Sequence, residues 1–223
     1  MSVETILFIV ECIGICSFSV SGTLISIQKK TDVIGALFFA LLTCFGGGLL
    51  RDLLLGITPP HVLSDPGYHI LLLICLSVSF VVFELSFIPK ISAFIEKFKH
   101  VFLLYFTDAI GLSIFCVFGV DIALQSSTVH NPLLLIVCGC ITGVGGGMLR
   151  DIVSGEIPLI FKKHIYLLPA ILGSTLYVFT YSHLPHLVSM LLAIVLIIAI
   201  RLLAIIFKWN LPVPGKKKDC NKS

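Results

Sequence analysis

The sequence predicts an all-α membrane protein with seven transmembrane helices, arranged as two inverted three-helix repeats and a seventh helix, with the N-terminus outside and the C-terminus inside. Three observations predict this fold. The 223 residues are 57% hydrophobic and 12% charged, with a mean hydropathy of +1.10, which is too apolar for a water-soluble domain of this size. Seven apolar stretches are long enough to cross a bilayer. One unusual motif occurs twice.

Each predicted span approaches the ~20 apolar residues that a bilayer-crossing helix needs. The linkers are short and carry turn residues, so no room remains for a separate soluble domain. Glu4 precedes the first span and Lys29 and Lys30 follow it, which is opposite to a cleaved signal, so we expect this span to be permanent. The predicted spans are residues 5–27, 33–55, 69–88, 101–123, 132–154, 165–182 and 187–207.

The lysines predict the orientation. With the N-terminus outside, every lysine falls in an inward-facing loop or in residues 208–223, which we interpret as a basic cytoplasmic tail. The inward-facing lysines are also expected to attract anionic lipid, at about 1 kcal/mol for each lysine near the surface. The candidates for lipid contact are Lys29, Lys30, Lys162 and Lys163.

A glycine triplet followed by two apolar residues, arginine and aspartate occupies residues 46–52 and recurs at residues 145–151. Three glycines in a helix interior cost about 2 to 3 kcal/mol relative to alanine, and a charged pair at membrane depth costs more. We therefore expect each triplet to interrupt its helix, so that the freed carbonyl oxygens replace part of a cation's hydration shell. Close helix packing through small residues is the alternative.

The repeat extends beyond this motif, because Glu11 and Asp108 match at an offset of 97 residues and Thr43 and Thr142 match at an offset of 99. Each unit, 1–90 and 100–185, contains three spans, and an odd number of spans inverts the second unit in the membrane. Residues 187–207 add the seventh span. The two triplet helices are then expected to meet near the midplane and to line a pathway with Thr43, Gly46, Gly47, Gly48, Thr142, Gly145, Gly146 and Gly147.

Arg51 and Arg150 follow their triplets by about one helical turn, at opposite ends of the expected pathway. We expect each guanidinium to gate a mouth or to pair with a carboxylate, and a headgroup anchor is the alternative. Neighbouring residues point in different directions on a helix, so Asp52 and Asp151 are expected to pair across the repeat interface instead of with the adjacent arginine.

Glu11 and Asp108 are charged residues inside predicted spans, and neither has a basic residue one turn away. Their expected partners are an arginine of one repeat, water in a vestibule or the passing cation, and a fixed structural salt bridge is equally compatible with the sequence. Glu84 and Arg201 lie near the inner ends of their spans, where an interfacial position is expected.

The sequence predicts no disulfide framework, metal site or cofactor. Seven of the eight cysteines fall within predicted spans without ligand spacing, so we interpret them as small apolar packing residues. No nucleophile, base and orienting residue occur at a helix-compatible spacing, which argues against an enzyme. A nucleic-acid partner is not expected either.

The doubled motif, in a three plus three plus one arrangement, resembles the trimeric intracellular cation (TRIC) channel family over residues 3–207. The resemblance implies a homotrimer in which each subunit has its own pore, lined by kinked second and fifth helices and permeable to potassium and sodium ions. It places both glycine triplets at the kinks. Beside the pathway it places Arg51, Asp52, Arg150 and Asp151.

Animal members of that family carry a lysine and glutamate signature near the first kink, where this chain has Thr43, Cys44 and Phe45. The resemblance therefore implies a prokaryotic plasma-membrane protein and gives no support for calcium-store counter-ion duty. A cation channel is the favoured function. A secondary transporter of a small solute such as glycine stays open, because it would use the same inverted repeats, with helix N-termini holding the carboxylate.

Overall fold

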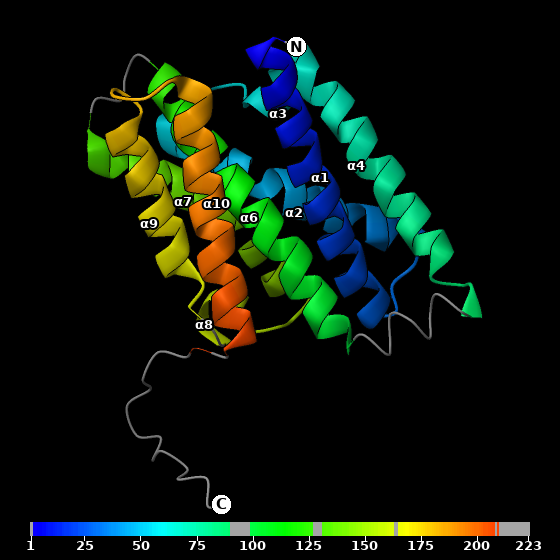
Figure 1. Ribbon diagram of the computed structural model, residues 1–223. Helices are drawn as coiled ribbons and strands as arrows, with labels where there is room; N and C mark the ends of the chain where they lie inside the picture. The colour runs from blue at the N-terminus through cyan, green and yellow to red at the C-terminus, as the bar shows by residue number, and fades with distance from the viewer. Residues whose placement is uncertain (1, 90–98, 127–130, 163–164, 208, 210–223) are drawn as a thin grey trace, which may run out of the picture.

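The computed structural model describes residues 2–89, 99–126, 131–162, 165–207 and 209. The regular structure of these residues is helical (Figure 1). The seven long helices agree with the predicted spans to within three residues at each end. The helices are α1 (Val3–Gln28), α2 (Val33–Leu55), α3 (His61–Ser64), α4 (Pro66–Leu85), α6 (Lys99–Gln125), α7 (Pro132–Val153), α8 (Leu159–Lys162), α9 (Leu167–Thr180) and α10 (His186–Ile206).

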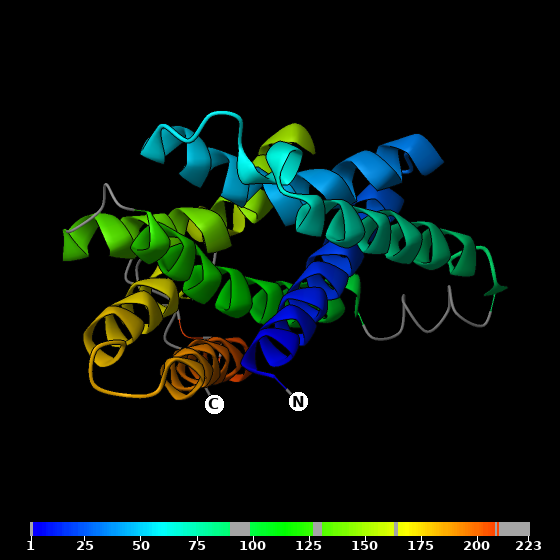
Figure 2. The same ribbon diagram turned by 90° about the horizontal axis from the view of Figure 1, so that it is seen from above.

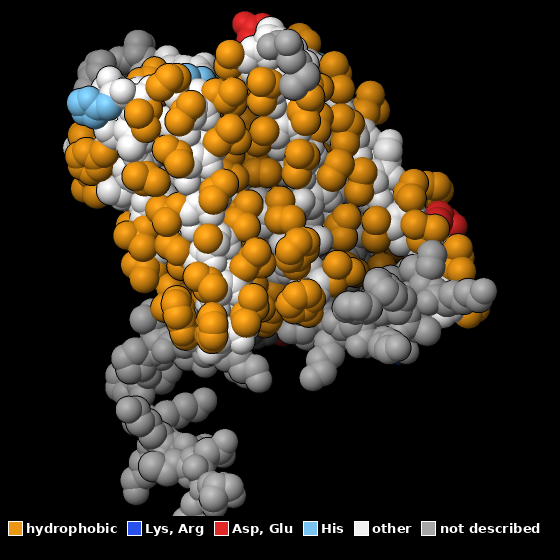
Figure 3. Space-filling model, viewed as in Figure 1, with side chains coloured by type: hydrophobic (Ala, Val, Ile, Leu, Met, Phe, Trp, Pro, Cys, Tyr) orange, Lys and Arg blue, Asp and Glu red, His pale blue; other side chains and the backbone are white. Residues whose placement is uncertain are grey.

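Six of the described helices are long and apolar enough to cross a membrane, namely α1, α2, α4, α6, α7 and α10. The predicted span at 165–182 corresponds to α9, which has 14 residues and covers only about 21 Å at 1.5 Å per residue. Apolar side chains cover the face of the molecule that Figure 3 shows, as expected for a surface in contact with lipid. The predicted tail at 208–223 lies outside the described residues except for Trp209.

The helix ends follow from local sequence signals. Asp32, Asp65 and Asn131 each accept a backbone N–H at the start of α2, α4 and α7, and prolines occupy the first turn of the last two. After the two triplet helices the chain turns through Gly56 and Gly155, whose φ angles are +68° and +72°. Only glycine adopts this left-handed conformation without a steric penalty, so the chain turns at the same repeat position after each central helix.

The first helices of the two repeats, α1 and α6, cross in opposite directions (Figures 1 and 2). Gly14 of α1 faces Phe115 of α6, whereas Phe18, one turn later in α1, packs on Gly111, one turn earlier in α6. The Phe18 and Phe115 rings stack with their centroids 5.1 Å apart. The two helices therefore pack antiparallel, with a phenylalanine of each helix against a glycine of the other.

The central helices α2 and α7 run unbroken through their glycine triplets, so the predicted interruption and the freed carbonyl oxygens are wrong. The triplets instead allow the two backbones to touch. A Cβ atom on Gly47 would overlap the carbonyl oxygen of Thr142, and a Cβ atom on Gly146 would overlap that of Thr43. Close approach through small residues, the alternative interpretation, explains these two glycines because each helix presents bare backbone to the other.

The other glycines of each triplet have different neighbours. Gly46 faces Leu149 of α7, and Gly145 faces Leu50 of α2. In each case a leucine methyl group limits the room for an added Cβ atom. Gly48 is less restricted, because the nearest atom to its Cβ position is Nη2 of Arg51 at 3.9 Å. The second glycine of a triplet is therefore the one that the helix contact requires.

We predict that Gly47→Ala destabilises the protein and that Gly48→Ala does not. The first change forces a methyl group into the α7 backbone, which costs about 1 to 3 kcal/mol or more. The second adds a methyl group to open space and gains about 1 kcal/mol of helix propensity. The midpoint of thermal unfolding in detergent measures both. Equal effects of the two substitutions would contradict this account of the triplet.

Candidate functional site

Each motif arginine is paired with the aspartate that follows it. Arg51 donates to Oδ1 of Asp52 from Nε at 2.9 Å and from Nη2 at 2.6 Å, and Nε of Arg150 lies 2.9 Å and Nη2 2.8 Å from Oδ1 of Asp151. The predicted pairing across the repeat interface is therefore wrong. The long, flexible arginine side chain reaches the carboxylate of the neighbouring position.

The second oxygen of each aspartate binds the backbone of the following short helix. Oδ2 of Asp52 accepts the N–H of His61 at 2.9 Å, at the start of α3, and Oδ2 of Asp151 accepts the N–H of Leu159 at 2.8 Å, at the start of α8. Each motif therefore joins the end of a central helix to the loop after it. We call the surroundings of Arg51 and Arg150 the Arg51 half and the Arg150 half.

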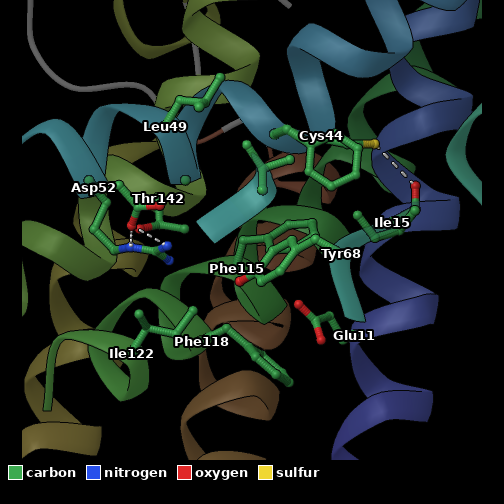
Figure 4. A pocket seen from close by; sticks show the side chains of 14 residues that line it. Glu11, Ile15, Cys44, Leu49, Asp52, Tyr68, Phe115, Phe118, Ile122 and Thr142 are labelled. Carbon is green, nitrogen blue, oxygen red and sulfur yellow. Dashed lines mark hydrogen bonds and ion pairs between the residues drawn. The ribbon is translucent and has the colours of Figure 1, made fainter. Parts of the chain in front are cut away.

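The Arg51 half contains a small cavity of about 20 Å³, which has room for roughly one water molecule. It lies between α1, α2, α4, α6 and α7, and Glu11 shares it with the aromatic rings of Tyr68, Phe115 and Phe118 (Figure 4). Glu11 makes no hydrogen bond or ion pair with the residues that the structure describes, so its carboxylate has no fixed partner there. Tyr68 also lines an open recess that includes His61, so the cavity and the recess adjoin.

The Arg150 half is filled by a cluster of charged side chains. Asp108, the counterpart of Glu11, accepts a hydrogen bond from the Tyr166 hydroxyl at 2.7 Å and lies 3.1 Å from Nη1 of Arg150. Nη1 of Arg150 also lies 2.5 Å from the hydroxyl of Ser21. The nearest recess, lined by Gly147 and Tyr166 among others, has no room for a water molecule. For Asp108 the fixed salt bridge is the interpretation that applies, whereas it does not apply to Glu11.

Arg201 of α10 belongs to the same cluster, so its predicted interfacial position is wrong. Its side chain is 2% exposed, its guanidinium stacks over the Tyr166 ring at 4.2 Å, and Nη2 lies 3.8 Å from Oδ2 of Asp108. Glu84, by contrast, is exposed near the end of α4. We define the inner ion cluster as Asp108, Arg150, Asp151, Arg201, Tyr166 and Ser21.

The predicted pathway residues divide among three places. Gly48 and Thr142 line the cavity of the Arg51 half, and Gly147 lines the small cavity of the Arg150 half. Thr43 is buried at the helix contact, and its hydroxyl donates to the carbonyl of Phe39 at 2.6 Å. The Thr142 hydroxyl likewise bonds its own helix, at 2.7 Å. The structure thus brings both triplets together but separates the two cavities by the α2–α7 contact.

Among the four lysines predicted to contact lipid, Lys29 forms an ion pair with Glu156 at 2.7 Å, and Lys30 is exposed at the end of α1. The Lys162 side chain and all of Lys163 lie outside the described residues. The seven described cysteines are free, although Sγ of Cys75 approaches Sγ of Cys44 to 3.5 Å between α4 and α2. In the described ranges no group of three ligating side chains is placed to hold a metal ion.

Sequence reasoning missed Tyr68, Tyr166, Ser21 and the cluster position of Arg201. The tyrosines had a signal, because they are 98 residues apart, close to the offsets of the other repeated positions. Ser21 and Arg201 had none, since Ser21 has no serine at the matching position of the second repeat and Arg201 lies outside both repeats.

Comparison with known proteins agrees with this duplicated site. The family model described as "Glycine transporter" matches residues 8–85 and again 105–182. A UPF0126 membrane protein of Vibrio cholerae is 33% identical over 94% of this chain and 82% of its own length. The UPF0126 inner membrane protein YadS of Escherichia coli is 30% identical over 95% of this chain and 96% of its own length. The solved TRIC trimeric intracellular cation channel orthologue from Rhodobacter sphaeroides is 31% identical over 92% of this chain and 100% of its own, with a TM-score of 0.80.

The chain belongs to the TRIC channel family. It is an integral, multi-pass bacterial membrane protein. Each of the two matched segments carries one Arg–Asp motif. The helix α10 begins at His186 and lies beyond both matched segments, so Arg201 reaches this TRIC site from outside the duplicated region.

We predict that Arg150→Ala destabilises the protein more than Arg51→Ala. Removal of Arg150 leaves Asp108 and Asp151 buried without their shared cation, and breaking a buried pair costs about 3 to 5 kcal/mol. Removal of Arg51 leaves only Asp52, which keeps the His61 N–H and borders a larger cavity. Thermal unfolding in detergent compares the two variants. A larger loss for Arg51→Ala would contradict the account that Arg150 neutralises two buried carboxylates and Arg51 only one.

Proposed function

We propose that the chain is a channel for monovalent cations, potassium and sodium, with a pathway in each subunit between α2 and α7. The pathway runs from the recess and cavity of the Arg51 half, past the glycine contact, to the Arg150 half. Two aligned features support it. Each half has a recess against a central helix, with room for about one water molecule in the Arg51 half, and the third glycine of each triplet lines that recess.

The observation that carries the proposal is the unpaired carboxylate of Glu11 in the cavity of the Arg51 half. Arg51 and Asp52 neutralise each other at 2.6 Å, so Glu11 supplies the net negative charge of that half. A carboxylate at membrane depth is costly unless a cation or water compensates it. A passing monovalent cation compensates Glu11 transiently, which favours cations over anions without holding any ion tightly.

Conduction requires a change at the glycine contact, because the backbones of α2 and α7 touch between the two cavities. We propose that the helices separate there and that Arg51 and Arg150 move with them as gates. The two motifs suit this role, since each aspartate links its arginine to the short helix that follows. A helix shift would thus displace a mouth loop together with its arginine.

We propose the remaining properties from the family resemblance and the charge pattern. The chain forms a homotrimer in the bacterial plasma membrane, with α9 as the seventh span, the N-terminus outside and the C-terminus inside. Lys29, at the end of α1, lies on the side that this orientation makes cytoplasmic. The same side is proposed to contact anionic lipid through Lys29, Lys30, Lys162 and Lys163.

A transporter of a small solute such as glycine is the second candidate, favoured by the description of the matching family model. Such a site would use the free N-termini of broken helices to hold a carboxylate. Because α2 and α7 are unbroken at their triplets, neither offers a free helix N-terminus there. Saturable, ion-coupled glycine uptake into liposomes by the purified protein, without channel currents, would replace the channel proposal.

We predict discrete currents in a planar bilayer under asymmetric potassium chloride, reversing near the potassium equilibrium potential. Glu11→Gln should lower the potassium conductance at least twofold and shift the reversal potential toward zero, because the cavity loses its net charge. Glu84→Gln, at an exposed position of α4, is the matched control and should leave both unchanged. Equal currents from wild type and Glu11→Gln would remove Glu11 from the pathway.

A further inference from the structure

Arg201 is the one Asp, Glu, Lys or Arg residue of helix α10, and its side chain is almost fully buried. This burial is unusual in an apolar helix that can lie in lipid, because a charged side chain near a helix end ordinarily reaches the headgroups. Arg201 instead turns into the bundle and reaches Asp108 of α6. The contact joins a helix outside the duplicated segments to the second repeat.

Three contacts hold the guanidinium in place. Its plane lies 4.2 Å over the ring of Tyr166, Nη1 donates to the carbonyl of Ile165 at 3.4 Å, and Nη2 lies 3.8 Å from Oδ2 of Asp108. Tyr166 in turn donates its hydroxyl to the same oxygen of Asp108. Arg201 therefore covers Asp108 from one side while Arg150 binds its other oxygen at 3.1 Å.

The equivalent position in the first repeat has no second arginine. Glu11 and Tyr68 lie in an open cavity with Arg51 and Asp52, which gives two carboxylates and one guanidinium. The inner ion cluster has two carboxylates and two guanidinium groups. Without Arg201 both halves would have the same formal charge, so one residue outside the repeat accounts for the difference.

We propose that Arg201 is the positioning residue that keeps Asp108 inside the inner ion cluster and thereby makes the Arg150 half neutral and closed to cations. The inference rests on the proposed cation pathway and explains why its two halves differ in charge. A cation that enters from the Arg51 half meets a free carboxylate at Glu11 but none at Asp108. The barrier to conduction lies accordingly in the Arg150 half, and α10 sets its height.

The first test measures whether Asp108 is covered, independently of any current. The full-length protein in detergent is treated with a water-soluble carbodiimide and glycine methyl ester, and mass spectrometry compares the modified fractions of Asp108 and Glu11. In wild type Glu11 should be modified and Asp108 protected. Arg201→Gln should raise the modification of Asp108 at least threefold without changing that of Glu11. Arg201→Lys, which keeps the charge and loses the stacked plane, should give an intermediate value.

Modification of Asp108 as readily as Glu11 in wild type would overturn the proposal, even if no variant folds. An unchanged Asp108 signal in a folded Arg201→Gln protein, with a monodisperse elution profile, would overturn it too. The second test records potassium currents, where Arg201→Gln should raise the single-channel conductance at least twofold and Arg201→Lys should not. A silent wild type would reject the cation pathway, whereas a conducting wild type with an unaffected Arg201→Gln would reject the role of Arg201 alone.

Discussion

The rest of the structure depends on the backbone contact between α2 and α7. Gly47 meets the carbonyl of Thr142 and Gly146 meets the carbonyl of Thr43, so the two contacts are related by the repeat. Arg51 and Arg150 cannot move independently of this contact, because each arginine follows its triplet within about one turn. The contact thus sets the depth of Arg51 and Arg150 and leaves one cavity on each side.

The two halves show how a duplicated framework can hold different chemistry. The backbone features are the same in both, with a third glycine at each cavity and an aspartate bound to the next short helix. The side chains differ at the acidic position, where Glu11 is unpaired and Asp108 is held by Arg150 and Tyr166. The shorter aspartate and its extra partners convert an open site into a filled one.

The sequence predicted the helices well and the site only partly. Apolar length and capping residues such as Asp32 and Asn131 determine the spans locally, so they can be read without a structure. The pairing of charged residues cannot be read from helix geometry alone. Neighbouring positions such as Arg51 and Asp52 point in different directions on an ideal helix, yet the flexible arginine side chain still reaches the aspartate. Burial of Arg201 was missed because hydropathy treats a charge near a helix end as interfacial, whereas the neighbours that cover it come from α6 and from the residues just before α9.

The polar contacts of α10 also explain how a helix outside the repeats keeps its position. Two apolar helices in a bilayer gain little from burying apolar surface, because lipid chains are equally apolar, and their register needs close packing or polar contacts. α10 has such a contact with α6 near each end, from His186 to Asp121 at 2.8 Å and from Arg201 to Asp108 at 3.8 Å. A shift by one turn would break both and leave two buried carboxylates with fewer partners. Arg201 therefore both alters the charge of the Arg150 half and fixes the register of α10.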